Sequence, residues 1–242
     1  LHQLAKPVFE RSVYGNIMGF SDRAATYVLE RLGMNINTHF ATAQNSHQNL
    51  QRLRATQWID HKVKCFFEHN PQGQGLEISS GLSTRFHRIS SQLDWPRFTW
   101  QMINPCDIDD CIHFVFPKLD NFRSLASRHP INFLPTCLGW QGATSNIVII
   151  GENQPLTRQH IQSNLIPTLN TLAAGKIKAL ECIICYSDCS LKKLLQHQAF
   201  SMLVVDEYQP PKHRPYWLQA LRRFITIKQK QTVNLSHVKF YF

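Results

Sequence analysis

Acidic residues are scarce in this sequence of 242 residues, and none follows Glu207. The chain contains 26 Lys and Arg against 16 Asp and Glu, which gives a formal net charge of +10. The region after Glu207 is correspondingly basic and contains Lys212, Arg214, Arg222, Arg223, Lys228, Lys230 and Lys239. A basic region can bind nucleic acid, but no recognised binding motif accompanies these cations, and they are not interleaved with aromatic residues that look exposed. We therefore expect a solvated basic face, with an RNA-directed enzyme as the weaker alternative.

Long apolar stretches are also missing. The longest apolar runs, Ile147–Ile150 and Met202–Val205, have the length of strands. A membrane-spanning helix needs about 18 or more consecutive apolar residues. The first residues do not follow the charged and then apolar pattern of a secretory signal. We expect a cytoplasmic protein that does not bind membranes.

A paired cysteine framework is missing too, because the seven cysteines are an odd number. The most metal-like pattern is Cys182-x-x-Cys185-x-x-x-Cys189 with His197 nearby, but a zinc site needs a fourth ligand at a suitable spacing. Cys182 and Cys185 fall in an expected strand, where they would point to opposite faces. We expect reduced core cysteines and no metal site. The twelve histidines include no His-x-x-x-His pair, so we expect them at the surface or in polar parts of the core.

What the sequence does contain is a helical start followed by alternating strands and helices. Asp22 can cap a helix that ends at Gly33, and a long helix is expected from Leu50 to Phe67. We expect an N-terminal helical extension over residues 1–72 and one α/β domain over residues 73–242, which together form a compact unit.

The expected strands are short apolar runs bounded by turn residues. They cover Leu76–Ile78, Phe98–Ile103, Arg123–Ala126, Asn146–Ile150, Ile177–Tyr186, Phe200–Tyr208 and His237–Phe242. The helices expected between and after them cover Leu82–Leu93, Thr157–Leu172 with a break at Pro167, Leu191–His197 and Tyr216–Phe224. This alternation predicts an α/β fold with a mostly parallel sheet that has helices on both faces.

A ligand site is expected where the first strand ends, because open α/β sheets bind ligands at the carboxyl ends of their strands. The turn Ser79-Ser80-Gly81 is built of small residues that let a ligand approach the backbone closely. Glu77 lies just before this turn, and Asn104 ends the second strand, where a polar side chain can bind ribose hydroxyls. A purely structural turn would explain the same residues about as well.

Residues 54–98 resemble the leucine carboxyl methyltransferase family, in particular its bacterial branch of small-molecule O-methyltransferases of polyketide-type pathways. The resemblance is carried by Ile59-Asp60, Val63, Leu76-Glu77-Ile78, Gly81-Leu82-Ser83-Thr84-Arg85-Phe86, Arg88 and Leu93-Asp94-Trp95-Pro96-Arg97-Phe98 with Trp100. It implies a Rossmann-like class I methyltransferase sheet with an N-terminal helical lid. It also implies transfer of a methyl group from S-adenosylmethionine to a small carboxylic acid or a peptide-like acceptor. Such a transfer needs no acid–base pair, so no catalytic residue is assigned.

The cofactor-binding residues that follow from the turn and the resemblance are Arg11, Arg54, Glu77, Ser79, Ser80, Gly81, Ser83, Asn104 and Glu152. Arg11 and Arg54 are candidates for the methionine carboxylate, because a guanidinium binds carboxylates with two hydrogen bonds.

The sequence departs from the family pattern at several of these positions. Ser79 stands where the family has the first glycine of Gly-x-Gly, and Asn104 stands where it has an acidic residue. No acidic residue follows the third strand. The resemblance implies that Glu152 corresponds to the acidic residue of a family motif after the fourth strand. Asp107 or Asp109 is a second candidate for the ribose contact. These departures leave open an alternative: a methyltransferase-like scaffold that has lost the cofactor and serves a protein partner.

Overall fold

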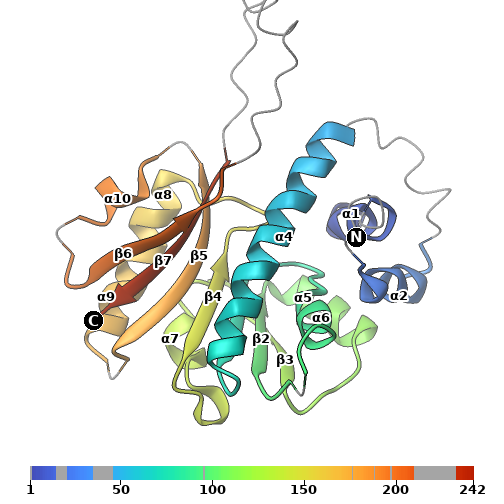
Figure 1. Cartoon of the computed structure of the whole chain (residues 1–242), viewed down its shortest axis with the longest axis horizontal. Coiled ribbons are helices and arrows are strands. Elements are labelled where there is room, and N and C mark those ends of the chain that lie inside the picture. The colour runs from blue at the N-terminus through green and yellow to red at the C-terminus, as the bar shows by residue number, and fades with distance from the viewer. Residues whose placement is uncertain are drawn as a thin grey trace, which may run out of the picture.

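The structure of this protein is a computed structural model, which describes residues 2–14, 21–34, 46–94, 96–175, 177–187, 189–196, 198–209 and 233–242 (Figure 1). The expected helix Tyr216–Phe224 lies outside these residues. So do Trp95, His197 and the basic residues from Lys212 to Lys230. Among the described residues, no helix is both long enough and apolar enough to cross a membrane.

The core of the protein is a seven-stranded sheet with the strand order β3-β2-β1-β4-β5-β7-β6. Its strands are β1 (Gln74–Ile78), β2 (Thr99–Asn104), β3 (Phe122–Ala126), β4 (Asn146–Ile150), β5 (Ala179–Ser187), β6 (Ser201–Glu207) and β7 (Val233–Tyr241). Strand β7 runs antiparallel to both β5 and β6, and the other pairings between described strands are parallel. The expected α/β, Rossmann-like, mostly parallel sheet is confirmed. The chain order reverses between β1 and β4, and this switch point is where such sheets bind ligands.

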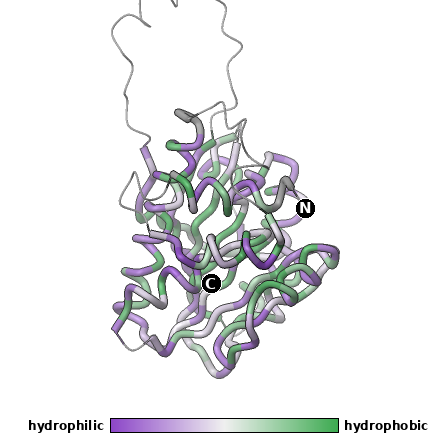
Figure 2. The backbone as a smooth tube through the Cα atoms, turned by 90° about the vertical axis from the view of Figure 1, so that its right-hand side faces the viewer, coloured by the Kyte–Doolittle hydropathy of each residue, from purple (hydrophilic) through white to green (hydrophobic). Residues whose placement is uncertain are grey.

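Helices cover both faces of the sheet. They are α1 (His2–Tyr14), α2 (Arg23–Arg31), α4 (Ser46–His69), α5 (Arg85–Ser90), α6 (Cys106–Val115), α7 (Leu134–Cys137), α8 (Arg158–His160), α9 (Ile166–Ala173) and α10 (Leu191–Leu194). One buried apolar cluster joins the sheet to α1, α2, α4, α5 and α6, and a second joins it to α7, α9 and α10. Figure 1 shows α4 crossing in front of the sheet with α1 and α2 beside it. Figure 2 shows hydrophobic and hydrophilic stretches alternating along the helices, as expected of helices that bury one face.

The N-terminal helices form for the reasons that the sequence suggested. Asp22 accepts a hydrogen bond from the backbone N–H of Ala25 and so caps α2, and Gly33 follows the helix with a positive φ of 65°. The division at residue 72 and the role of the first helices as a lid remain predictions.

Tight packing at the centre of the sheet begins with Gly75. It lies beside Trp100 in the register of β1 and β2. A Cβ atom at Gly75 would lie 2.2 Å from the indole ring of Trp100. A glycine is therefore needed for β1 to accommodate this fully buried aromatic side chain.

The helix expected at Leu82–Leu93 is shorter in the structure, where α5 covers only Arg85–Ser90. The residues before it form a turn because Gly81 has a positive φ of 62°. Polar side chains also bond within the turn, since Ser83 Oγ accepts a hydrogen bond from the backbone N–H of Arg85. Such local side-chain bonds compete with helix formation.

The expected break at Pro167 has a specific form. The helix that starts after Thr157 contains a π-helical segment, η3 (Ile161–Leu165), before it continues as α9. In a regular α-helix Pro167 would have to donate an N–H to the carbonyl of Ser163, and proline has none. The wider π turn avoids this conflict. Segments of this kind are frequent at functional sites.

The last expected strand, His237–Phe242, is longer than the sequence indicated. Strand β7 begins at Val233 and lies between β5 and β6. Its first residues, Val233 and Asn234, are exposed or half-buried, so an apolar run does not mark the start of the strand.

Candidate functional site

The turn after β1 has a strained backbone. Ser79 has a positive φ of 55°, as Gly81 does with 62°. A left-handed conformation costs a non-glycine residue about 1–2 kcal/mol. Two hydrogen bonds hold the turn against β2: the N–H of Ser79 donates to the carbonyl of Ile103 at 2.8 Å, and the N–H of Gly81 donates to Asn104 Oδ1 at 3.0 Å. The conformation of Ser79 is one that a glycine would adopt without this cost.

Two buried polar atoms of this turn and of the end of β2 have no hydrogen-bond partner among the residues that the structure describes. They are Ser80 Oγ and Asn104 Nδ2, and both residues are 5% exposed or less. The side chain of Asn104 has a fixed orientation, because its oxygen accepts the hydrogen bond from Gly81. A buried polar group without a hydrogen bond costs about 1–3 kcal/mol, and a ligand that supplies the missing partner recovers that free energy. These atoms therefore fit a ligand that presents hydroxyl groups.

Glu77 and Glu152 are both bound to one arginine. Arg85 is fully buried and bonds to Glu77, and its Nη2 lies 2.7 Å from Glu152 Oε1. Glu77 also accepts hydrogen bonds from Ser83 Oγ at 2.9 Å and from Trp100 Nε1 at 3.2 Å. The motif that carries the family resemblance is thus held together by its own arginine.

The same network reaches the N-terminal helices. Asp60 of α4 lies 2.6 Å from Arg85 Nε and 2.7 Å from Arg88 Nε. Arg88 also contacts Asp22, at 2.9 Å, and Asp22 is 3.0 Å from Arg11 Nε. Arg11 donates a second hydrogen bond to the carbonyl of Leu82 at 3.2 Å. Helices α1, α2 and α4 are therefore tied to the turn by buried ion pairs.

Burial and charge act in opposite directions on the carboxyl groups of this network. Burial alone would raise the pKa of Glu152, but the charge and hydrogen bonds of Arg85 outweigh it and lower the pKa to about 2. Burial raises the pKa of Glu77, although Arg85 opposes this shift. Glu152 is the partly exposed carboxylate of the two, with 17% of its side chain exposed against 1% for Glu77. Arg85 therefore keeps Glu152 ionised more effectively than Glu77.

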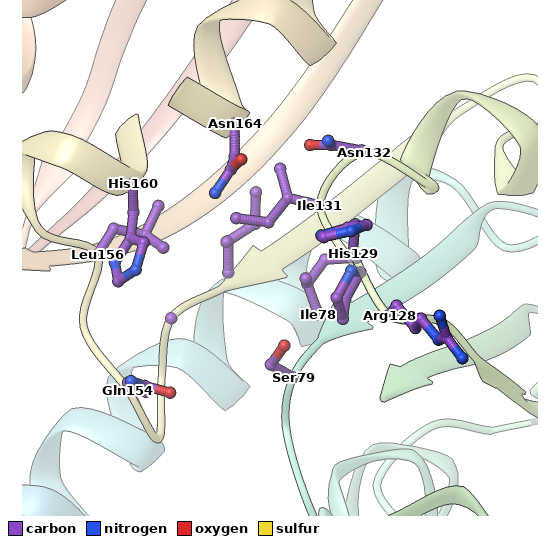
Figure 3. Close-up of a pocket in the computed structure, with 13 residues that line it drawn as sticks. Ile78, Ser79, Arg128, His129, Ile131, Asn132, Gln154, Leu156, His160 and Asn164 are labelled. Carbon is purple, nitrogen blue, oxygen red and sulfur yellow. The ribbon is translucent and has the colours of Figure 1, made fainter. Parts of the chain in front are cut away.

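A cavity of about 310 Å³ lies on the other side of the turn, at the carboxyl ends of β1 and β4 (Figure 3). This volume is near the lower end of the range for small-molecule sites. Its lining residues come from the two strand ends, the loop after β3 and the helix after β4: Ile78, Ser79, Arg128, His129, Pro130, Ile131, Asn132, Ile150, Gly151, Gln154, Leu156, His160 and Asn164. Gly151 is required at its position, because a Cβ atom there would lie 2.6 Å from the carbonyl of Cys185.

Of the nine residues predicted for the cofactor, only Ser79 lines this cavity. Gly81 and Asn104 form the turn contact on the β2 side, and the carbonyl of Ser80 accepts a hydrogen bond from Asn153 Nδ2. Arg11, Glu77, Ser83 and Glu152 belong to the buried ion-pair network. Arg54 is half-buried and lies near Tyr208. Burial raises the pKa of Tyr208, and the positive charge of Arg54 reduces this rise. The structure does not bring Arg54 into either group.

The other predicted groups are also located. Asp109 accepts a hydrogen bond from Ser124 and lies 3.4 Å from His113, so its carboxylate is directed toward β3 and its own helix. Cys182 and Cys185 belong to the apolar clusters on opposite faces of the sheet, as expected for two residues three positions apart in one strand.

The cavity histidines were missed by the sequence reasoning. His129 and His160 are two of twelve dispersed histidines, and no spacing motif marks them. A usable signal was their position, since His129 follows the third strand and His160 lies at the helix start after the fourth. Both places are at the ligand-binding edge of a parallel sheet.

Neither a family model nor a curated protein sequence matches this chain. Solved structures of similar fold include CurJ carbon methyltransferase, with a TM-score of 0.47, 12% identity and coverage of 97% of this chain but only 66% of that one. Plantazolicin methyltransferase BamL, in complex with a desmethylPZN analog and SAH, has a TM-score of 0.44 and 12% identity over 98% of this chain and 97% of its own. MtNAS in complex with MTA and tNA has a TM-score of 0.44 and 8% identity over 90% and 69%. Similarities this distant assign no activity to this chain.

Proposed function

We propose that this chain is an S-adenosylmethionine-dependent O-methyltransferase, related to the leucine carboxyl methyltransferase family, that acts on a small carboxylic acid or a peptide-like acceptor. The observation that carries the proposal is the pair of unpartnered buried atoms, Ser80 Oγ and Asn104 Nδ2, at the ends of β1 and β2. Ribose hydroxyls at this place would supply both missing partners. The site lies at the switch point, where nucleotide-type ligands bind open α/β sheets.

Two separate regions lie at the carboxyl-end edge of the sheet, one on each side of the turn after β1, and their separation supports the same function. Gly81 and Asn104 meet on the β2 side of the turn, and Ser79 lines the cavity beside β4. S-adenosylmethionine supplies an activated methyl group. When bound, it would supply this methyl group to a carboxylate oxygen of the acceptor and leave as the neutral thioether. The carboxylate is already ionised, so the protein's part is to place the two reactants and exclude water.

Substitution of the two orphaned groups tests this proposal. Ser80→Ala removes a hydroxyl that has no internal bond, so we expect unchanged or slightly higher stability together with an affinity for S-adenosylhomocysteine that is about five- to tenfold lower. Calorimetric titration measures the affinity, and thermal unfolding measures the stability. Ser90 provides a matched control, because its hydroxyl is also buried and unpartnered but lies on α5. Ser90→Ala should leave the affinity unchanged.

The alternative function, a scaffold that no longer uses the cofactor, is favoured by one specific observation. Both motif carboxylates, Glu77 and Glu152, are bonded to Arg85, and no carboxylate is among the residues that line the cavity. Titration of the unmodified protein separates the two functions. Binding of S-adenosylmethionine at micromolar concentration supports the enzyme, and the absence of detectable heat at millimolar ligand supports the scaffold.

A further inference from the structure

The polar lining of the cavity has charge of only one sign. Arg128, His129 and His160 contribute cationic or N–H-donating groups, and the described residues of the lining include neither Asp nor Glu. The amides of Asn132, Gln154 and Asn164 complete the polar part. A cationic ligand would find no charged partner in this lining. An anionic oxygen group would find several donors, and hydrogen bonds to charged acceptors are about twice as strong as neutral ones.

His160 is a donor toward the cavity because of its place in the helix. Its Nδ1 accepts in the capping box that starts α8, 3.2 Å from Thr157 Oγ1 and 3.4 Å from the backbone nitrogen of Thr157. The hydrogen bond made by one ring nitrogen determines which nitrogen carries the proton in neutral imidazole. An Nδ1 that accepts from the backbone N–H of Thr157 leaves the proton of the neutral ring on Nε2, which can then donate a hydrogen bond.

The remaining donors surround the same space. Figure 3 shows His160 and Asn164 projecting from the helix toward the strand ends, with His129 approaching from the loop after β3. Arg128 lies at the rim with its guanidinium turned outward, so it adds positive charge at the entrance. Ile78, Ile131, Ile150 and Leu156 form the apolar part of the lining. The ligand is therefore expected to combine one anionic group with a small apolar body.

We propose that this cavity binds the carboxylate of a small organic acid, whose remaining part is uncharged, through His129, His160 and Asn164. If the proposed function holds, this acid is the methyl acceptor. The cavity then selects a small carboxylic acid over a peptide-like acceptor, because its volume of about 310 Å³ is at the lower end for small-molecule sites. A carboxylate that enters from the β4 side would lie across the Ser79 turn from the ribose site.

Calorimetric titration with benzoate and with its neutral isostere benzamide tests the inference without cofactor or turnover. We expect benzoate to bind about tenfold more tightly than benzamide. His129→Phe keeps an aromatic ring of similar size but removes the N–H groups, and it should abolish most of this preference. His160→Phe should do the same and also weaken the start of α8, so His129→Phe is the cleaner variant. His61→Phe, on the exposed side of α4, is the matched control and should retain the preference.

Two results would overturn the inference: equal binding of benzoate and benzamide, or a preference that survives His129→Phe. Tighter binding of phenyl phosphate than of benzoate would assign the cavity to a phosphate ester and overturn the carboxylate assignment. The proposed function fails separately, if S-adenosylmethionine does not bind while benzoate still binds with its preference. Ser80→Ala should weaken the binding of S-adenosylhomocysteine and leave that of benzoate unchanged.

Discussion

Ser79 shows how a single side chain can conflict with the backbone that it belongs to. Its φ of 55° lies in the region that glycine adopts freely. Residues held in such conformations cluster at ligand sites, where the surrounding structure maintains the strain. Here the strain is maintained by the hydrogen bond from Ser79 to Ile103 and by the fixed position of Gly81 on Asn104.

Replacement of Ser79 by glycine should therefore stabilise the protein. We expect Ser79→Gly to raise the unfolding free energy by about 0.5–1 kcal/mol, since relief of the strain exceeds the entropy that glycine adds to the unfolded chain. Gln141 also has a φ of 55° but lies outside the cavity lining, so Gln141→Gly is the matched control. Urea unfolding should show a gain for both variants, while only Ser79→Gly should alter ligand binding. A loss of stability in Ser79→Gly but not in Gln141→Gly would contradict the conclusion that the backbone at Ser79 is strained.

Asn104 is the residue at which a carboxylate can be introduced at the end of β2. In Asn104→Asp one carboxylate oxygen can still accept the hydrogen bond from Gly81, and the other can accept from a ribose hydroxyl with a full charge. We expect about tenfold tighter binding of S-adenosylhomocysteine. We also expect lower stability of the free protein, because the carboxylate is buried. Calorimetry and thermal unfolding measure the two effects, and an unchanged or weaker affinity would place the ribose elsewhere.

At the scale of elements, the short helix α5 carries the two arginines, Arg85 and Arg88, that connect several parts of the fold. These two side chains connect the turn after β1 to α2, α4 and the end of β4. Four carboxylates and three guanidinium groups take part, namely Asp22, Asp60, Glu77 and Glu152 with Arg11, Arg85 and Arg88. Loss of Arg85 leaves Glu77 and Glu152 without the cation that pairs with both of them.

The variant Arg85→Met should accordingly destabilise the protein by about 3–5 kcal/mol, the range for breaking a buried ion pair. The surface pair Lys64–Glu68 on α4, with an N–O distance of 3.7 Å, gives the comparison, since Lys64→Met should cost less than about 1 kcal/mol. Urea denaturation of both variants measures the difference. Similar losses for the two would show that the Arg85 network adds little to stability.

Much of the element pattern could be predicted because it depends on local features. The buried run Asn146–Ile150 is β4 as expected, and the Asp22 cap and Gly33 end of α2 are set by neighbouring residues. Asn104 and Gly81 were also expected beside one another at the strand ends. The ion pair between Glu77 and Arg85 was not expected, because it depends on side chains that three elements bring together. The histidines of the cavity were missed for the same reason, since their shared position follows from the fold.

At the scale of the whole molecule, the network makes stability depend on pH. Glu152 has a pKa of about 2 in the folded protein against an ordinary value of 4.5. Its contribution to the unfolding free energy is therefore fully present above about pH 4.5 and is lost as the pH falls toward 2. Glu77 acts in the opposite direction, because its raised pKa makes the folded state hold a proton more readily as the pH falls.

Glu152→Gln isolates the first of these effects. We expect it to lower the unfolding free energy by about 1–3 kcal/mol near neutral pH, because Arg85 retains Glu77 and Asp60 as partners. The difference between the variant and the unmodified protein should shrink at about pH 3. Urea unfolding at the two pH values measures it, with Glu68→Gln on the exposed face of α4 as the control. A difference that stays constant with pH would contradict the role assigned to Glu152.

The π segment Ile161–Leu165 gives the protein a means of changing its ligand without rebuilding its core. Leu169 and Leu172 of α9 anchor the far end of this helix in the apolar cluster. A π turn holds about one residue more than an α turn over the same span, so a one-residue deletion within the segment would be absorbed by a return to the α-helix while His160 and the anchors keep their places. Only the side chains within the segment, Asn164 among them, would then be exchanged. Length variation at this point is thus a route by which related sequences could acquire a different ligand preference.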